Sequence, residues 1–299
     1  MRAIFELVVD ADGRGATIYD YLRRTAGVSR GLLRRLKTDG CITCNGQEAR
    51  LRSVLAPGDR LVLYLADEPS QGVIPEPGSL EILYEDHHLL IVNKPAGMVT
   101  HPVRETVRGT LANRVAAHLA GAGVAVRPVH RLDRDTSGAV LFAKSPYAHQ
   151  NCARQRSQGG FHRLYLAVLA GRLPARWGTI DRPVARLSSH PVRRTTRADG
   201  AVDARPSLTT FRTLRRWKGA TLVAVRPETG RTHQIRVHFS DLGFPLLGDV
   251  LYGASPTNLI GRQALHAFRL SFRHPVTGQP LLVQAPLQPD FISLLSHLE

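Results

Sequence analysis

Cysteine is scarce in this chain of 299 residues, which holds only Cys41, Cys44 and Cys152. An odd and sparse set of cysteines does not support the disulfide framework of a small secreted domain. Long apolar runs are also lacking, because no stretch approaches the ~18–20 apolar residues that span a bilayer. The first twelve residues contain three acidic residues and no apolar core of a signal peptide. We therefore expect a cytoplasmic protein that does not enter the membrane.

Acidic residues are few relative to basic ones. Asp and Glu number 24 against 40 Lys and Arg, which gives a formal net charge of +16. A charge of this sign and size indicates a polyanionic partner such as a nucleic acid. Arginine supplies most of the charge, and its planar guanidinium favours bidentate contacts to phosphate. The alternative is a charge that serves solubility in a protein with a neutral small substrate.

Residue patterns typical of metal or redox sites are missing as well. Cys41 and Cys44 form a C-x-x-C pair, but zinc needs four ligands, and a thioredoxin site places its first cysteine at a helix N-terminus. This pair instead falls in an expected strand between two turns. His233 and His238 are five residues apart, whereas a separation of four places two imidazoles on one helical face. We therefore expect no metal and no cofactor.

A helix with a basic face is predicted near the N-terminus. Ser29 can cap its start, three leucines form its apolar face, and Gly40 ends it. Arg30, Arg34 and Lys37 have the i, i+4, i+7 spacing that places side chains on one face. That face can bind RNA or can simply be solvated, and the spacing supports both readings equally.

Two short strands are predicted after this helix. "CITCNG" ends in an Asn-Gly turn, and "LAPGDRLVLYL" combines a turn with a second strand. This order resembles the small RNA-binding domain first described in ribosomal protein S-four, through Ser29, Arg30, Gly40, Asn45, Gly46, Gly58 and Asp59. We expect this domain at residues 1–65. The Pro-, Gly- and Ser-rich residues 66–79 are predicted to be a linker, followed by a larger domain at residues 80–299.

A dense polar run, "RPVHRLDRDTSGAVLFAKS", occupies residues 127–145. It is either a solvated turn before a buried strand or a reaction centre mounted on that strand, since Ala139–Ala143 is apolar without interruption. Upstream, "NKPAGMVTHP" predicts a loop shaped by proline and glycine with Lys94 and His101 near its ends. Two cations on such a loop favour contact with an anionic backbone.

Two further segments contain candidate residues. Tyr165 is predicted at the start of an apolar strand, where most tyrosines are core or edge residues. "GRTHQIRVH" at residues 230–238 predicts a short helix with Thr232 as its N-cap, from which His233, Arg236 and His238 project. Taken alone, these residues do not identify a reaction.

Together the motifs resemble a known family. "NKPAGMVTHP", "HRLDRDTSG", "LYLAVLAG", "GRTHQIRVH", "GD" and "YG" within residues 248–253, and "LHA" at 265–267 follow the order found in RluA-type pseudouridine synthases. The resemblance implies isomerisation of uridine in RNA: the bond to the ring nitrogen breaks, uracil turns, and a carbon–carbon bond forms to the same sugar. An RNA-binding module like residues 1–65 precedes this catalytic domain in members that modify large-subunit ribosomal RNA, which is the substrate we expect.

The resemblance also implies roles for single residues. Asp133 matches the essential aspartate, which attacks the sugar or the base or removes a sugar proton. Arg236 matches its cationic partner, and Tyr165 matches a tyrosine whose ring stacks on the uracil. Arg131 matches an arginine that contacts RNA where the base leaves its helix. The complete set of expected RNA contacts is Arg30, Arg34, Lys37, Lys94, His101, Arg131, Arg231 and His233.

The fold class implied by the resemblance is α+β. We expect a catalytic domain with a mixed, mainly antiparallel β-sheet and flanking helices, joined flexibly to the small α/β RNA-binding domain. The protein is expected to act as a monomer that flips the target base out of its helix. Three alternatives stay open: a synthase acting on transfer RNA, a non-catalytic RNA-binding factor for ribosome assembly, and a metal-dependent nuclease.

Overall fold

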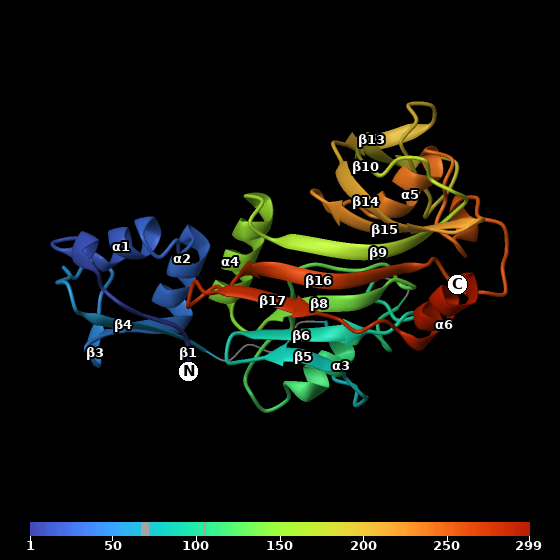
Figure 1. The fold of residues 1–299 in the computed structure, drawn as a ribbon. Coiled ribbons are helices and arrows are strands. Elements are labelled where there is room, and N and C mark those ends of the chain that lie inside the picture. Colours follow the sequence, from blue (N-terminus) through green and yellow to red (C-terminus); the bar gives the residue numbers. More distant parts are fainter. Residues whose placement is uncertain (67–71, 104–105) are drawn as a thin grey trace.

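The computed structural model describes residues 1–66, 72–103 and 106–299. They form a small N-terminal unit with a sheet of its own, and a larger unit with one large and one short sheet (Figure 1). The predicted linker at residues 66–79 lies partly outside the described residues, and its residues 72–79 contain neither helix nor strand. Among the described residues no helix is long and apolar enough to cross a membrane.

The N-terminal unit places two helices against a four-stranded antiparallel sheet. Its helices are α1 (Ile18–Arg24) and α2 (Arg30–Asp39), and its strands, in sheet order, are β1 (Arg2–Val8), β4 (Arg60–Leu65), β2 (Gly40–Cys44) and β3 (Gln47–Ala49). The Ser29 hydroxyl accepts a hydrogen bond from the Leu32 backbone N–H at 3.1 Å, so the predicted cap of α2 is confirmed. Asn45 and Gly46 form the β2–β3 turn with φ of 53° and 82°, the positive angles of a two-residue hairpin.

The second unit is built on a ten-stranded sheet. Its main path is β10 (Trp177–Asp181), β14 (Leu208–Arg216), β15 (Ala220–Pro227), β9 (His162–Ala170), β16 (Leu265–Arg273), β8 (Ser137–Ala143), β6 (Leu89–Lys94) and β5 (Ile82–Glu85). Two strands pair off this path, β17 (Pro280–Gln284) with β16 and β7 (Arg127–Pro128) with β8. Only the β16–β8 pairing is parallel within this described sheet, which confirms the expected mixed, mainly antiparallel architecture.

Helices and a short sheet surround the large sheet. The third sheet has the order β12 (Arg194–Thr195), β11 (Val184–Leu187) and β13 (Ala201–Arg205). The helices of the second unit are α3 (Leu111–His118), α4 (Pro146–Ser157), α5 (Gln234–Asp241) and α6 (Pro289–Leu298). The described residues also include the 3₁₀ turns η1 (Ala11–Gly13) and η2 (Val250–Tyr252). The expected α+β class is therefore confirmed.

The apolar run of β8 is continuous because both faces of this strand are buried. Val140 and Phe142 pack in the core that includes residues of α3, whereas Ala139 and Leu141 pack in the core that includes residues of α4. Successive side chains of a strand point to opposite faces, so a strand covered on both sides needs apolar residues at every position. The strand predicted after the polar run is confirmed, and it lies inside the large sheet, between β16 and β6.

The N-terminal unit packs against α4. Tyr147 of α4 stacks on Phe5 of β1, with ring centroids 3.8 Å apart, and belongs to the core of the N-terminal unit. The Gln150 side chain accepts from the Ser29 N–H at 2.9 Å and donates to the Gly27 carbonyl at 2.6 Å. These contacts differ from the flexible junction expected from the linker, because linker composition carries no information about docking elsewhere in the chain.

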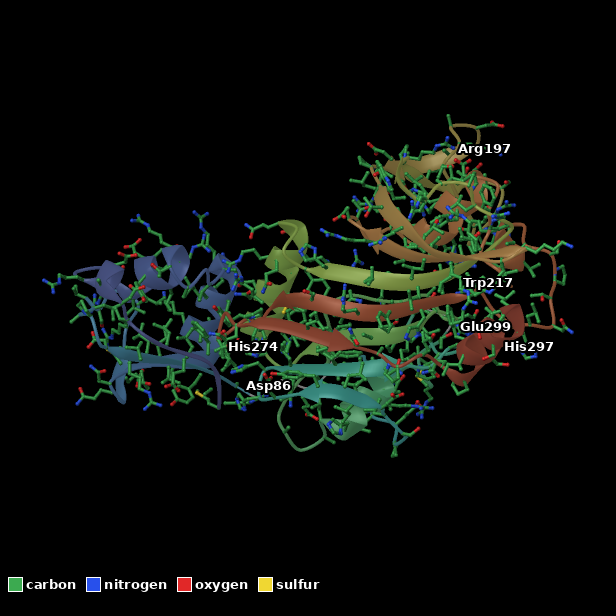
Figure 2. All side chains as sticks on the ribbon, viewed as in Figure 1. Asp86, Arg197, Trp217, His274, His297 and Glu299 are labelled. Atoms are coloured by element: carbon green, nitrogen blue, oxygen red, sulfur yellow. The ribbon has the colours of Figure 1, made fainter. Side chains whose placement is uncertain are left out.

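A histidine–aspartate pair lies at the end of the large sheet that faces the N-terminal unit. Figure 2 shows Asp86 and His274 there, with His274 Nε2 and Asp86 Oδ2 2.8 Å apart. Arg2 of β1 reaches the same region and donates to the His87 carbonyl at 2.7 Å. The junction between the two units therefore combines aromatic packing with polar contacts.

Candidate active site

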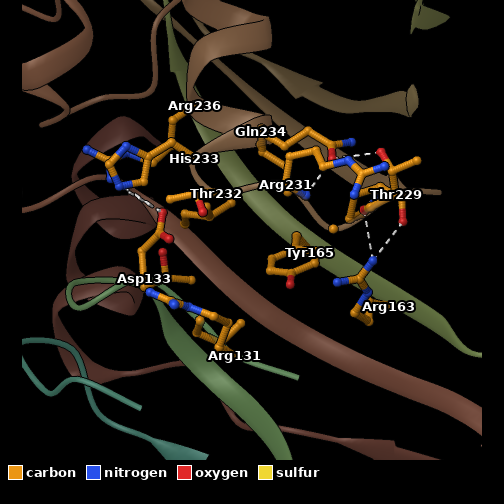
Figure 3. Close-up of a pocket in the computed structure, with 16 residues that line it drawn as sticks. Arg131, Asp133, Arg163, Tyr165, Thr229, Arg231, Thr232, His233, Gln234 and Arg236 are labelled. Carbon is orange, nitrogen blue, oxygen red and sulfur yellow. Dashed lines mark hydrogen bonds and ion pairs between the residues drawn. The ribbon is translucent and has the colours of Figure 1, made fainter. Parts of the chain in front are cut away.

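A pocket opens beside the polar run that precedes β8 (Figure 3). Its lining comes from residues 131–136, from β9, from the loop at residues 227–233 and from the first turn of α5. The empty space within this lining amounts to about 550 Å³, including space open to solvent. Segments about a hundred residues apart in the sequence thus meet around one cavity.

The turn that carries Asp133 is held in place by its neighbours. The Asp133 carbonyl accepts from the Thr136 N–H at 3.1 Å, and the Thr136 hydroxyl accepts from Gln263 at 3.2 Å. Gly138 follows with φ of 114°, and a Cβ there would lie 2.3 Å from the Ala267 carbonyl oxygen. Only glycine fits this close approach of β8 to β16. The polar run is therefore both a turn before a buried strand and one wall of the pocket.

Arg236 bridges two carboxylates. Its Nη1 lies 3.3 Å from Asp133 Oδ2, so the predicted pairing of these two side chains is present in the structure. Its Nε and Nη2 donate to the two oxygens of Asp249 at 2.7 and 2.8 Å, a bidentate contact. The Asp249 side chain is 1% exposed and that of Asp133 is 20% exposed. Burial acts to lower the pKa of Arg236, but the hydrogen bonds and charge of Asp249 outweigh it and raise that pKa above its ordinary value.

The start of α5 differs from the prediction. His233, not Thr232, is the N-cap, and it has a left-handed φ of 58° without a side-chain capping bond. The Gln234 side chain closes this turn instead, because its oxygen accepts from the Arg231 N–H at 3.0 Å and the Thr229 hydroxyl at 2.8 Å. A threonine before an apolar periodic segment has the sequence pattern of a cap, but here the glutamine occupies the donors of the turn.

Tyr252 lies beneath the cation of the site. The Arg236 guanidinium carbon is 5.0 Å from the centre of the Tyr252 ring, within the range of a cation–π contact. The Tyr252 hydroxyl is 2.9 Å from His233 Nδ1 and accepts from the Arg194 backbone N–H at 2.9 Å. Asp249 and Tyr252 lie in the "GD" and "YG" motifs of the resemblance, which predicted no individual role for either residue.

Tyr165 forms another wall of the pocket. It lies within β9, which begins at His162, so the strand starts three residues earlier than predicted. Figure 3 shows its ring between Asp133 and Arg163. The Arg163 guanidinium donates to the Thr229 carbonyl at 2.9 Å and thereby ties β9 to the pocket loop. Burial raises the pKa of Tyr165, so its hydroxyl stays protonated at neutral pH.

Lys94, one of the expected RNA contacts, is buried beneath the site. Its side chain is fully buried, and Nζ donates to the carbonyls of Pro95, Met98 and Arg134 at 2.7–2.8 Å. Burial lowers the pKa of Lys94 to about 7. Three carbonyl acceptors nevertheless fit the ammonium with its three donors better than the neutral amine with two. Lys94 therefore joins two loops beneath the site. Its burial contradicts the predicted direct contact with RNA, because no part of the side chain is accessible.

The other expected RNA contacts lie in three places: at the pocket, at His101 and on α2. Arg131, Arg231 and His233 line the pocket, and Arg131 is exposed. His101 is partly buried, and burial lowers its pKa. The remaining three side chains are exposed on α2 in the N-terminal unit and do not line this pocket: Arg30, Arg34 and Lys37. In the described part of the chain no three His, Cys, Asp or Glu side chains are grouped to hold a metal ion.

Comparisons with known proteins agree on one family. A family model described as RNA pseudouridylate synthase matches residues 88–241. RNA pseudouridine synthase YhcT of Bacillus subtilis is 38% identical over 97% of this chain and 95% of its own. Ribosomal large subunit pseudouridine synthase D of Pseudomonas aeruginosa is 39% identical over 90% of this chain and 88% of its own. Among solved structures, human RNA pseudouridylate synthase domain containing 1 aligns with a TM-score of 0.60 and 30% identity, covering 73% of this chain and 90% of that one.

Proposed function

Because this chain belongs to the RNA pseudouridine synthases, which are isomerases, we propose that it converts uridines of large-subunit ribosomal RNA to pseudouridine, with Asp133 as the reacting carboxylate. The observation that carries the proposal is the geometry of one pocket. Asp133 lies 3.3 Å from a buried arginine and shares the pocket with the ring of Tyr165. The ribosomal substrate rests on relatives named for the large subunit.

The pocket accounts for how a carboxylate can react inside an enclosed site. Arg236 compensates the charge of Asp133 at Oδ2, and a guanidinium stays charged at any physiological pH. Within residues 1–66, 72–103 and 106–299, no hydrogen bond or ion pair engages Oδ1 of Asp133. Oδ1 is therefore the atom that we assign to the reaction with the uridine. Stacking of the base on Tyr165 contributes about 1–3 kcal/mol.

The uridine must leave its helix to reach Asp133, since a stacked base cannot enter an enclosed pocket. Extrusion costs a few kcal/mol. Arg131 is exposed where the pocket opens and is two residues from Asp133, so we assign to it the contact with RNA around the vacated position. The charge of Arg131 also suits the phosphates on either side of the flipped nucleotide.

A second groove extends the pocket toward the third sheet. It shares residues 230–232 with the pocket, and four arginines line it: Arg186, Arg194, Arg205 and Arg231. A single acidic residue, Asp203, also lines this groove. We assign this groove to the RNA backbone that flanks the target uridine, because its excess positive charge suits phosphates.

We further assign residues 1–65 to RNA binding, with the exposed basic face of α2 as the contact surface. Replacing Arg30, Arg34 and Lys37 together by glutamine is expected to weaken the salt dependence of RNA binding. The negative slope of log binding constant against log salt becomes less steep by about 2–3, as for three lost phosphate contacts. The turnover of bound RNA stays unchanged, because none of these side chains lines the pocket. An unaltered salt slope contradicts this assignment. The enzyme is assigned to the cytoplasm, where it acts as a monomer.

Mapping pseudouridines in total RNA from cells with and without the gene tests the substrate. We expect one or a few sites to disappear from large-subunit ribosomal RNA. Loss from transfer RNA alone would instead support the transfer-RNA alternative, and an unchanged map would contradict the proposal. RNA that is modified but uncut in the presence of a chelator excludes the nuclease.

A further inference from the structure

A chain of polar contacts runs from the third sheet to Asp133. The Arg194 backbone N–H on β12 donates to the Tyr252 hydroxyl at 2.9 Å, and that hydroxyl lies 2.9 Å from His233 Nδ1. The other ring nitrogen, His233 Nε2, is 3.8 Å from Asp133 Oδ2. The His233 side chain is 9% exposed, which leaves it little surface for the RNA contact expected from the sequence.

The donor at the far end sets the direction of the hydrogen bonds. A backbone N–H donates only, so the Tyr252 oxygen accepts there and its own hydrogen is available for His233 Nδ1. Within the described ranges of the chain this hydroxyl has no other hydrogen-bond partner. Burial raises the pKa of Tyr252 to about 12, so its hydrogen is retained at neutral pH. Burial also lowers the pKa of His233, which favours the neutral ring.

A neutral imidazole that accepts a hydrogen bond at Nδ1 carries its hydrogen on Nε2. The geometry points to Tyr252 and His233 as positioning residues for Asp133: the Tyr252 hydroxyl fixes the His233 tautomer whose Nε2–H faces Asp133 Oδ2. The inference rests on the proposed function only in taking Asp133 as the reacting group. The contacts themselves are independent of the reaction.

This arrangement directs two N–H groups toward the same carboxylate oxygen, that of Arg236 at a hydrogen-bond distance of 3.3 Å and that of His233 at a longer 3.8 Å. Arg236 Nη1 and His233 Nε2 both face Oδ2, from the first turn of α5 and its N-cap. The left-handed backbone of His233 is uncommon for a residue other than glycine, and it belongs to the turn that aims the ring at Asp133. With Arg236 bonded to Oδ2 and the His233 ring beside it, rotation of the carboxylate is restricted and Oδ1 is presented to the uridine.

The tautomer can be read directly by NMR. In full-length protein labelled with ¹⁵N-histidine, the signals of His233 are those missing from the His233→Gln variant among the 13 histidines. We expect the wild-type ring to be protonated at Nε2 alone, and Tyr252→Phe to shift it toward a mixture of tautomers. A wild-type ring protonated at Nδ1, or on both nitrogens at neutral pH, would overturn the inference. This readout does not depend on catalysis.

Kinetic measurements on variants provide a second test of the positioning role. Tyr252→Phe is expected to lower kcat by up to ~10-fold, the effect of losing a hydrogen bond between two neutral groups, while KM for RNA stays unchanged. His233→Gln keeps an N–H donor near the Nε2 position and retains more activity than His233→Leu, which removes the donor. Tyr84→Phe is the matched control, because Tyr84 donates to Asp86 at 2.7 Å and does not line the pocket.

Two results overturn the positioning role: an unchanged kcat for Tyr252→Phe, or equal activity of His233→Leu and His233→Gln. A rise in KM with unchanged kcat has the same meaning, because it assigns these residues to RNA binding. If the wild type shows no turnover, the proposed function fails, but the NMR result still decides whether the Tyr252–His233 contact sets the tautomer.

Discussion

Replacement of Arg236 by methionine is the substitution that we expect to be most damaging to stability. Both oxygens of Asp249 depend on this guanidinium, at 2.7 and 2.8 Å, and the Asp249 side chain is 1% exposed. Loss of the cation leaves a buried carboxylate without its partner, which costs about 3–5 kcal/mol. Asp133 adds less to the loss, because its side chain is 20% exposed and water can screen its charge.

Urea denaturation followed by circular dichroism measures this effect as a drop in the free energy of unfolding. A double variant, Arg236→Met with Asp249→Leu, is the control because it removes both charges together. Apolar replacement of a whole buried pair is often neutral for stability, so the double variant is expected within about 1 kcal/mol of the wild type. Its turnover stays low, because Asp133 has still lost its cation.

A loss of less than about 1 kcal/mol in Arg236→Met, a value typical of exposed pairs, would contradict this cost of a stranded carboxylate. That cost is also contradicted if the double variant is as unstable as the single one, since it then does not come from the stranded Asp249. Recovery of turnover in the double variant would show that Asp133 does not need the charge of Arg236 for activity.

Three other predictions follow from buried side chains. Lys94→Met leaves three carbonyls without a donor and is expected to lower kcat, while the salt dependence of RNA binding stays constant. A salt dependence that is weaker by about one in the slope of log binding constant against log salt would instead show that Lys94 contacts a phosphate. Tyr147→Ala removes the stacking on the N-terminal sheet, so hydrogen exchange in β1 and α2 accelerates, and unchanged exchange would contradict the docked arrangement. Burial lowers the pKa of His130 to about 3 and that of His88 to about 4, so the unfolded chain takes up protons below pH 6.5 before the folded protein does. The free energy of unfolding therefore falls between pH 6.5 and about 3, and less steeply in His130→Gln, as urea titrations at several pH values can show.

The polar run at residues 127–145 could be placed correctly from the sequence because its neighbour is unambiguous. A strand with both faces buried is apolar at every position, and Ala139–Ala143 is such a run. The helix after Ser29 was equally accessible, since its cap, its apolar spacing and its terminal glycine are local signals. The pairing of Asp133 with Arg236 came from the family resemblance, because nothing local connects residues a hundred positions apart.

The errors arise where burial and tertiary contacts decide. Lys94 has a long cationic side chain in a loop, and only the fold shows that three carbonyls enclose it. The principal partner of Arg236 is Asp249, which stands in a short motif with no neighbouring cation in the sequence. The docking of α4 on the N-terminal unit depends on Tyr147 and Phe5, two aromatic residues that carry no pattern of their own.

Tritium release tests the central claim most directly. Full-length protein is incubated with a ribosomal RNA transcript whose uridines carry tritium at carbon 5, the position that loses its hydrogen when the new carbon–carbon bond forms. We predict release by the wild type and none by Asp133→Asn, which keeps the shape of the side chain without its charge. The absence of release by the wild type, or full release by Asp133→Asn, would contradict the account.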